Sequence, residues 1–291
     1  MANLRFLFRK RLSISPASID TAIRDYPFTI SRESANNYRD VVSVESGKFE
    51  DGAIHPLYLT KISWHIVENL NEFLFSPIKP SLLKMLVHMS NHFEYYKPLE
   101  YDKKYVVKSH LCLIEPHRKG TKLTLRFDYL LDDDLVAVEH TSGLLFGVKC
   151  QGKGRVFGKL PRHERVDEGD LWYENIPIER QLPYVYAKKA EIDAPIHTDP
   201  SFAKSIGLPD IILQGTCTFA MSVSLIMKAF NIEEREVKQL SVNFTGMLTT
   251  PNTIKVNIVF RSENKIVFSV NDDKGSTLIK GGSIIFASRS L

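Results

Sequence analysis

The chain has 291 residues, a formal net charge of +4, 43% hydrophobic residues and 25% charged residues, an ordinary composition for a soluble globular protein. The length favours two domains, each large enough to bury a core. Because the charge is mild and no segment combines a dense basic stripe with aromatic residues, we expect no nucleic-acid partner. No apolar run is long enough to span a bilayer.

The cysteines and the N-terminus bear on the cellular compartment. Cys112, Cys150 and Cys217 are odd in number and far apart, which argues against a disulfide framework and against a zinc site. A reducing compartment follows, and we predict a cytoplasmic protein. Residues 1–24 form a basic leader with four basic residues and no acid before Asp20. This composition resembles a mitochondrial presequence, so the mitochondrial matrix is the alternative location.

Residues 25–150, the N-terminal half, are predicted to form one domain. Apolar residues recur at three- and four-residue steps over 57–75, which indicates a helix that Pro77 and Pro80 would end. Strand-like segments with alternating apolar residues follow at 105–114, 121–131 and 135–148.

Residues 151–175 are polar and glycine-containing and are predicted as a linker, after which residues 176–291, the C-terminal half, repeat the plan. A long apolar helix is predicted over 211–230. Strands are predicted at 240–245, 253–261, 265–271 and 276–287. A helix that is apolar nearly all round must be buried. The repeated pattern therefore predicts an α+β protein with an internal duplication.

A rigid turn around His197 is the first candidate for chemistry. Pro195 restrains the chain just before His197, and Asp199 followed by Pro200 is a helix-start signal. Gly207 is the expected end of that short helix. The structural alternatives are that His197 only stabilises the turn and that Asp199 only caps the helix.

Gln214 and Gly215 open the long apolar helix of the C-terminal half. The free N–H groups and the positive dipole end of a helix start can stabilise a developing oxyanion. An imidazole held near such a helix start is suited to proton transfer beside a thioester carbonyl.

The stretch from Tyr186 to Gly215 resembles the signature of MaoC-like type 2 (R-specific) enoyl-CoA hydratases. The matching positions are Tyr186, Pro195, Ile196, His197, Asp199, Ala203, Gly207, Ile212, Leu213 and Gly215. Residues 86–99 resemble the N-terminal domain of two-domain members. The resemblance implies two tandem hot-dog domains, each an antiparallel sheet wrapped around a long apolar helix.

The resemblance also implies an activity. In the family, an Asp and a His activate the water that adds to a trans-2-enoyl thioester, and the backbone N–H of the helix-opening glycine holds the thioester oxygen. We therefore expect interconversion of trans-2-enoyl and (R)-3-hydroxyacyl thioesters of coenzyme A or acyl carrier protein. Neither a cofactor nor a metal is expected, because the thioester itself acidifies the α-carbon.

The motif departs from the family at the catalytic Asp, whose position is held by Ile192. The flanking carboxylates Glu191 and Asp193 are candidate replacements, although neighbours in an extended segment point to opposite faces. The candidate catalytic residues are His197, Asp193 and Glu191, and the candidate substrate-binding residues are Gly215, Gln214 and Tyr186.

Two other functions remain open from the sequence. Loss of the Asp favours a non-catalytic acyl-CoA-binding protein, and a thioesterase is an alternative by analogy of fold alone. His88, His92 and Glu94 have a spacing that can bind metal on a helix, but they precede a predicted strand and lack another ligand, so no metal site is predicted. We expect a homodimer.

Overall fold

The computed structural model describes residues 13–20, 23–44, 53–69, 86–161 and 169–288. Its main feature is an 11-stranded sheet in which ten strands follow the order β2-β4-β5-β6-β3-β11-β15-β14-β13-β9, and β8 (Arg155–Val156) pairs with β4. Every pairing within this sheet is antiparallel.

The two halves of the chain contribute five strands each along that order. Those of the N-terminal half are β2 (Tyr26–Thr29), β3 (Leu86–Tyr95), β4 (Lys104–His117), β5 (Gly120–Leu131) and β6 (Asp134–Phe146). Those of the C-terminal half are β9 (Trp172–Ile178), β11 (Val237–Phe244), β13 (Asn252–Arg261), β14 (Lys265–Asn271) and β15 (Thr277–Phe286). Read from each edge toward the middle, the orders 2-4-5-6-3 and 9-13-14-15-11 correspond, and the halves join where β3 pairs with β11.

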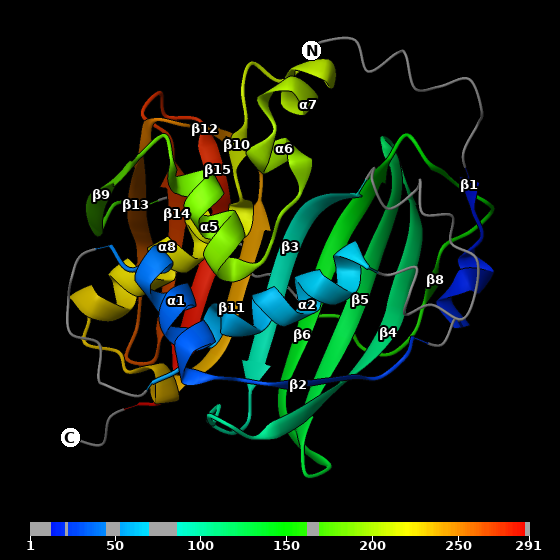
Figure 1. Ribbon diagram of the computed structural model, residues 1–291, viewed down its shortest axis with the longest axis horizontal. Helices are drawn as coiled ribbons and strands as arrows, with labels where there is room; N and C mark the ends of the chain where they lie inside the picture. The colour runs from blue at the N-terminus through cyan, green and yellow to red at the C-terminus, as the bar shows by residue number, and fades with distance from the viewer. Residues whose placement is uncertain (1–12, 21–22, 45–52, 70–85, 162–168, 289–291) are drawn as a thin grey trace.

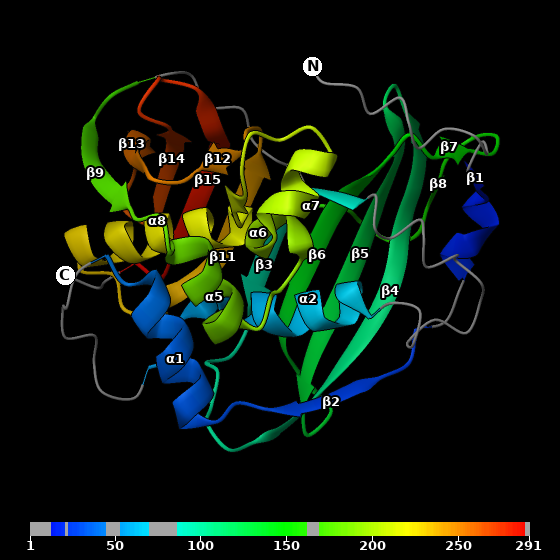
Figure 2. The same cartoon turned by 45° about the horizontal axis from the view of Figure 1, so that its top comes forward.

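Each half also has a helix against its strands. In the N-terminal half this is α2 (Leu59–Glu68), which follows the short η3 (Pro56–Tyr58) and crosses β3 to β6 in Figures 1 and 2. In the C-terminal half it is α8 (Gly215–Ala229), whose residues 216–227 are all buried. Phe219 of α8 stacks on Phe268 of β14, with ring centroids 6.4 Å apart. This burial explains why α8 can be apolar on every side.

Four further helices of the described segments pack near α2 and α8. They are α1 (Arg32–Val42), α5 (Leu182–Ala190), α6 (Pro195–Thr198) and α7 (Pro200–Ser205). The remaining short elements are β1 (Ser13–Ile14), η2 (Pro16–Asp20), β7 (Lys149–Cys150), β10 (Ile212–Leu213), η4 (Glu234–Glu236) and β12 (Leu248–Thr249). The fold is thus a hot-dog fold with a large antiparallel sheet and few helices.

The regular periodic segments were predicted well. The predicted strands correspond to β4, β5, β6, β11, β13, β14 and β15 within a few residues. The helix predicted over 211–230 is confirmed as α8, which begins later because β10 precedes it. The helix predicted over 57–75 is observed up to Glu68, and residues 70–75 lie outside the described part of the chain.

Some predictions were wrong or incomplete. His88 and His92 lie within β3 rather than before a strand. Of the segment predicted as linker, residues 155–156 form β8 and residues 172–175 begin β9. The sequence reasoning also missed α1 and α5.

The described residues contain three free, buried cysteines and no group of three or more His, Cys, Asp or Glu side chains arranged to hold a metal ion. Within the same residues, no helix is long and apolar enough to cross a membrane.

Candidate active site

His197 is held in one orientation by the backbone. It lies in α6, and its Nδ1 donates a hydrogen bond to the Ile212 carbonyl oxygen at 2.8 Å. A carbonyl can only accept, so Nδ1 carries a proton, and in the neutral ring Nε2 keeps its lone pair. Burial lowers the pKa of His197 below its ordinary value of 6.5, although the Ile212 bond and the charge of Asp193 oppose this change. A neutral imidazole with an accepting Nε2 can act as a general base.

The following short helix is built as the sequence predicts. Asp199 is the N-cap of α7, and its Oδ1 accepts hydrogen bonds from the N–H groups of Ser201 at 2.8 Å and Phe202 at 3.1 Å. Gly207 follows the helix with φ of 92°, a left-handed conformation that glycine adopts without strain. Asp199 therefore stabilises the turn that carries His197.

At the start of α8, Gly215 packs closely against Phe244, and the first backbone N–H groups have no partner within the helix. Gly215 is the first residue of α8, and a Cβ placed on it would be 3.0 Å from the Phe244 ring. The first N–H groups of a helix have no intrahelical partner, so the Gly215 amide is available to an oxyanion. Gln214 donates from Nε2 to the Pro183 carbonyl at 3.1 Å, and its buried Oε1 has no hydrogen-bond partner among the described residues.

Tyr186 contacts the first turn of α8 through its hydroxyl group. It lies in α5 and is fully buried, and its hydroxyl donates to Thr216 Oγ1 at 3.1 Å. Burial raises its pKa well above the ordinary value. In this position Tyr186 orients the first turn of α8.

The three residues at the altered motif point in three directions. Glu191 ends α5 in a left-handed conformation, with φ of 55°, and its Oε1 contacts Lys61 Nζ at 2.6 Å. Ile192 is buried in the core, only 3% exposed. Asp193 is exposed and accepts a hydrogen bond from Thr198 Oγ1 at 2.7 Å. The segment is therefore not the extended strand that the sequence suggested, since Glu191 turns toward α2 and Asp193 toward α6.

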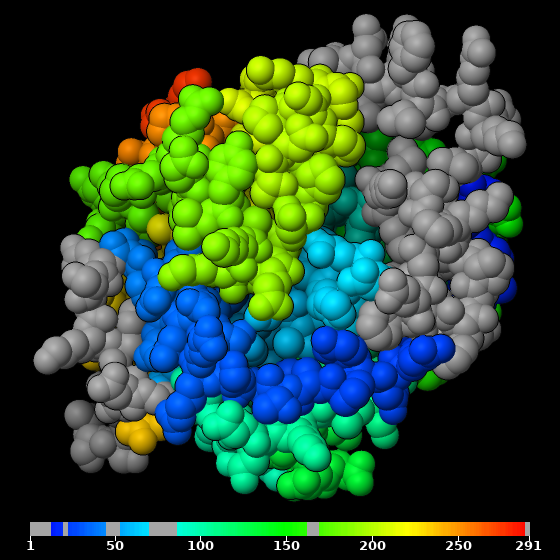
Figure 3. Space-filling view, viewed as in Figure 1, coloured from blue at the N-terminus to red at the C-terminus, as the bar shows by residue number. Residues whose placement is uncertain are grey.

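The N-terminal half reaches this site through α2. Lys61 and Glu68 are seven residues apart, two helical turns, and so lie on the same face of α2. Glu68 is exposed at the residue level, yet partial desolvation of its carboxyl group and, to a smaller extent, the charge of Asp193 raise its pKa to about 7. Figure 3 shows the surface of the α5–α7 segment adjoining that of α2. Sequence reasoning missed Glu68, although the helical spacing from Lys61 would have placed it on this face.

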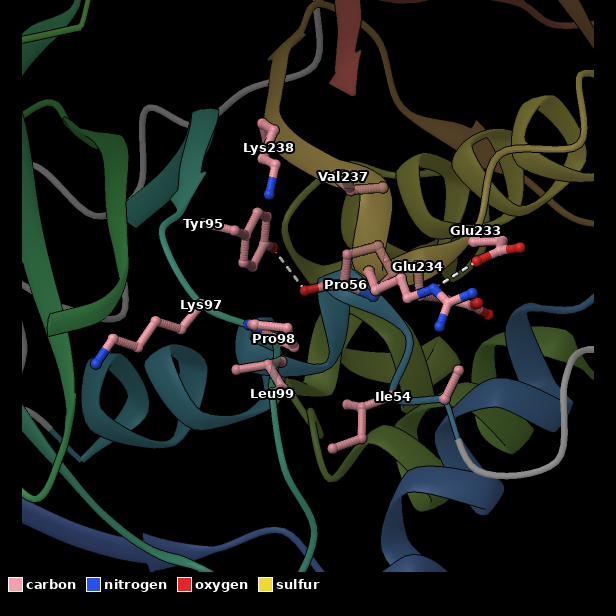
Figure 4. A pocket seen from close by; sticks show the side chains of 12 residues that line it. Ile54, Pro56, Tyr95, Lys97, Pro98, Leu99, Glu233, Glu234, Val237 and Lys238 are labelled. Carbon is pink, nitrogen blue, oxygen red and sulfur yellow. Dashed lines mark hydrogen bonds and ion pairs between the residues drawn. The ribbon is translucent and has the colours of Figure 1, made fainter. Parts of the chain in front are cut away.

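A cavity of about 280 Å³ lies elsewhere, beyond the C-terminal end of α8. Its lining combines apolar side chains such as Ile54 and Leu99 with charged ones such as Lys97 and Lys238, and Tyr95 donates a hydrogen bond to the Pro56 carbonyl oxygen (Figure 4). Its lining includes no residue of the His197 turn. The chemistry predicted from the sequence therefore does not belong to this cavity.

Comparison with known proteins agrees with the arrangement of the C-terminal half. Residues 186–280 match the model of the MaoC-like domain. The match covers about a third of the chain, all of it in the C-terminal half. The matched region contains His197 and the start of α8, so it includes the candidate site.

Related sequences cover only part of the chain. The enoyl-CoA hydratase ChsH3 of Mycobacterium tuberculosis is 34% identical over 77 residues, which is 26% of this chain and 27% of that protein. The peroxisomal hydratase-dehydrogenase-epimerase of Saccharomyces cerevisiae is 26% identical over 96 residues, 33% of this chain and 10% of that enzyme. The matches thus span about a quarter or less of these relatives' own length.

Solved structures match nearly the whole chain in fold. A MaoC-like dehydratase from Phytophthora capsici has a TM-score of 0.79 at 18% identity, covering 94% of this chain and 98% of that one. The peroxisomal multifunctional enzyme type 2 of Drosophila melanogaster has a TM-score of 0.72 at 16% identity, covering 91% and 48%. An acyl-ACP thioesterase from Bacteroides thetaiotaomicron has a TM-score of 0.58 at 9% identity, covering 94% and 99%. At these identities the likeness concerns the fold alone.

Proposed function

We propose that the protein is an acyl-thioester hydratase/dehydratase that interconverts trans-2-enoyl and (R)-3-hydroxyacyl thioesters. The observation that carries the proposal is the hydrogen bond from His197 Nδ1 to the Ile212 carbonyl. In the neutral ring it selects the tautomer whose Nε2 accepts, and its acceptor lies three residues before Gly215, where α8 begins. This contact supports the proposal that His197 serves as the base close to the start of α8, where the Gly215 amide would hold the oxyanion.

The proposed hydration uses these groups in sequence. His197 Nε2 takes a proton from water as the water oxygen bonds to C3 of the enoyl thioester. The electron pair of the C2–C3 double bond moves toward the thioester oxygen, where the Gly215 N–H stabilises the enolate. The His197 imidazolium then gives up its proton to C2, which completes the addition of water, and dehydration is the reverse. The thioester itself acidifies C2, so the step needs no redox cofactor.

Of the two carboxylates considered in place of the missing Asp, the geometry favours Asp193. Glu191 is engaged with Lys61 at 2.6 Å, whereas the charge of Asp193 acts directly on the His197 imidazole. Asp193 is therefore our proposed partner of His197, whose negative charge stabilises the imidazolium that forms when His197 takes a proton.

We further propose that the chain is a tandem duplication, with domains at 25–150 and 176–291 joined by residues 151–175. The corresponding strand orders of the two halves support this division. Substrates carried on coenzyme A or acyl carrier protein, a homodimer and a cytoplasmic location remain predictions.

The function is tested with the full chain and short-, medium- and long-chain trans-2-enoyl-CoA, by following loss of the enoyl-thioester absorbance. Chiral chromatography of the product identifies the (R)-3-hydroxyacyl form. We expect His197→Ala to lower turnover by about 100-fold or more, the range of general acid–base catalysis. The control is His110→Ala, which changes an exposed histidine on β4 and should leave turnover unchanged.

A second candidate is a non-catalytic acyl-thioester-binding protein, favoured by the burial of Ile192 at the position of the family's Asp. Saturable acyl-CoA binding without turnover at any chain length would establish it and refute the hydratase. Release of free thiol would instead identify a thioesterase.

A further inference from the structure

Strand β3 contains an irregularity next to the candidate site. His88 pairs with Gly143 of β6, whereas Ser90 pairs with Ser142, so β3 advances two residues while β6 advances one. The extra residue is Met89, and the pairing is that of a β-bulge. A bulge redirects the side chains on one side of it to the opposite face of the sheet.

The contacts of the neighbouring residues show which way His88 turns. Asn91 donates to Glu139 at 2.7 Å, and Glu139 also accepts from Ser63 of α2, so Asn91 faces α2. His92 points the other way, toward Ser241 Oγ at 2.7 Å. Regular alternation would place His88 on the same face as His92. The bulge places it with Asn91, toward α2 and the site.

His88 then lies between an aromatic residue from each half. Its ring centroid is 5.1 Å from that of Trp64 on α2 and 4.5 Å from that of Phe244 on β11. The Phe244 ring in turn packs against Gly215, the residue that opens α8. In Figures 1 and 2 the beginning of β3 lies beside α6 and α7. The His88 imidazole is therefore linked through Phe244 to the start of α8, from the N-terminal half of the chain.

The free polar atoms here are consistent with a ligand. His88 Nε2 and Trp64 Nε1 are both buried and have no hydrogen-bond partner within the described residues. Buried polar atoms in proteins are nearly always satisfied. Burial also lowers the pKa of His88 to about 3, although hydrogen bonding with Ser90 and Asn91 opposes the change, so the ring is neutral.

We propose that His88 is a substrate-binding residue of the site, whose Nε2 forms a hydrogen bond with the oxygen at C3 of the acyl thioester. This oxygen belongs to the attacking water in one direction and to the 3-hydroxyl group in the other. The inference rests on the proposed function. His197 provides one partner for that oxygen, while the Ile192 side chain, buried in the core, provides none. His88 stays neutral and orients the oxygen, and proton transfer remains with His197.

The first test measures binding without turnover. Histidine imidazole resonances of the full chain are followed by NMR during titration with (R)-3-hydroxybutyryl-CoA and, separately, with butyryl-CoA, which lacks the C3 oxygen. We expect the His88 resonance, identified by its loss in His88→Gln, to shift strongly only with the hydroxylated ligand. The exposed His110 should not respond. An unchanged His88 resonance would overturn the inference.

The second test measures affinity and catalysis. His88→Phe keeps a ring and removes the hydrogen bond, so we expect (R)-3-hydroxybutyryl-CoA to bind about tenfold more weakly, the effect of losing one hydrogen bond. Butyryl-CoA affinity should stay the same, and His88→Gln should recover part of the loss. Equal losses for both ligands would indicate a structural role and refute the inference.

The two proposals fail in different ways. If the unaltered protein hydrates enoyl-CoA and His88→Phe matches it in kcat, KM and ligand affinity, the inference about His88 falls and the function stands. If the unaltered protein shows no turnover but binds the hydroxylated ligand through His88, the function falls and the binding inference stands.

Discussion

The helices α2 and α8 occupy corresponding places in the two halves, but they contribute to the molecule in different ways. All residues from 216 to 227 of α8 are buried, so what this helix offers a ligand is its first turn at Gly215. Helix α2 is amphipathic. Its Lys61 contacts Glu191 of the C-terminal half, and the charge of Asp193 in that half raises the pKa of its Glu68. Corresponding helices of the two halves thus present different groups, backbone amides at the start of α8 and side chains along α2.

The cores of the two halves differ as well. At the altered motif, the C-terminal half buries Ile192 among apolar residues. The N-terminal half buries Glu139, which accepts hydrogen bonds from Ser63, Asn91, Tyr129 and Thr141 at 2.7 to 3.0 Å. The core around Ile192 is therefore apolar, whereas the core of the N-terminal half surrounds the Glu139 carboxyl group with hydrogen-bond donors.

Restoring the family's carboxylate with Ile192→Asp should produce the largest effect. The side chain points into the core, so the new carboxylate would be buried without a partner, and we expect a loss of about 3–5 kcal/mol in the free energy of unfolding. We expect no gain in turnover. Chemical denaturation and the enoyl-CoA assay measure the two outcomes.

The matched control is Ile192→Val, which removes one methylene group and should cost about 1 kcal/mol. If Ile192→Asp instead kept its stability and raised turnover, the position would face the substrate and the contrast between the two cores would be incorrect.

Glu139 should make the stability of the N-terminal half depend on pH. Burial raises its pKa from 4.5 to about 7, although its hydrogen-bond donors oppose the change. The folded state therefore binds a proton more tightly than the unfolded state, so stability is highest below pH 4.5, falls as pH rises toward 7, and then levels off. The expected decrease is about 3 kcal/mol.

Glu139→Gln is uncharged at every pH and should remove most of this decrease when denaturation curves are compared across the same window. Glu115→Gln, on β4 with 42% of its side chain exposed, serves as the control. An equally steep pH dependence in Glu139→Gln would show that another group is responsible.

The sequence predicted the parts of the fold whose local signals agree with their surroundings. Regular alternation marks strands such as β5, and Asp199 with Pro200 marks the start of α7. Strand β3 was missed because polar residues occur on both of its faces and the bulge at Met89 interrupts the alternation. The direction of Glu191 could not be read either, because its left-handed backbone is accompanied by a contact with Lys61, 130 residues away.

The pH profile of turnover should give the smallest effect, and it tests whether the charge of Asp193 acts on His197. Since burial lowers the pKa of His197 below 6.5, the neutral base persists to lower pH than for a free histidine. We expect kcat/KM to fall on acidification with a midpoint below 6.5. The charge of Asp193 raises the pKa of His197, so Asp193→Asn should move this midpoint further down, by a fraction of a pH unit, while Asp133→Asn in the turn between β5 and β6 should not. An upward movement of the midpoint in Asp193→Asn would mean that the carboxylate does not act on the imidazole as a neighbouring charge. Asp193 would then not be the partner of His197, and a group from the N-terminal half such as Glu68 would take its place.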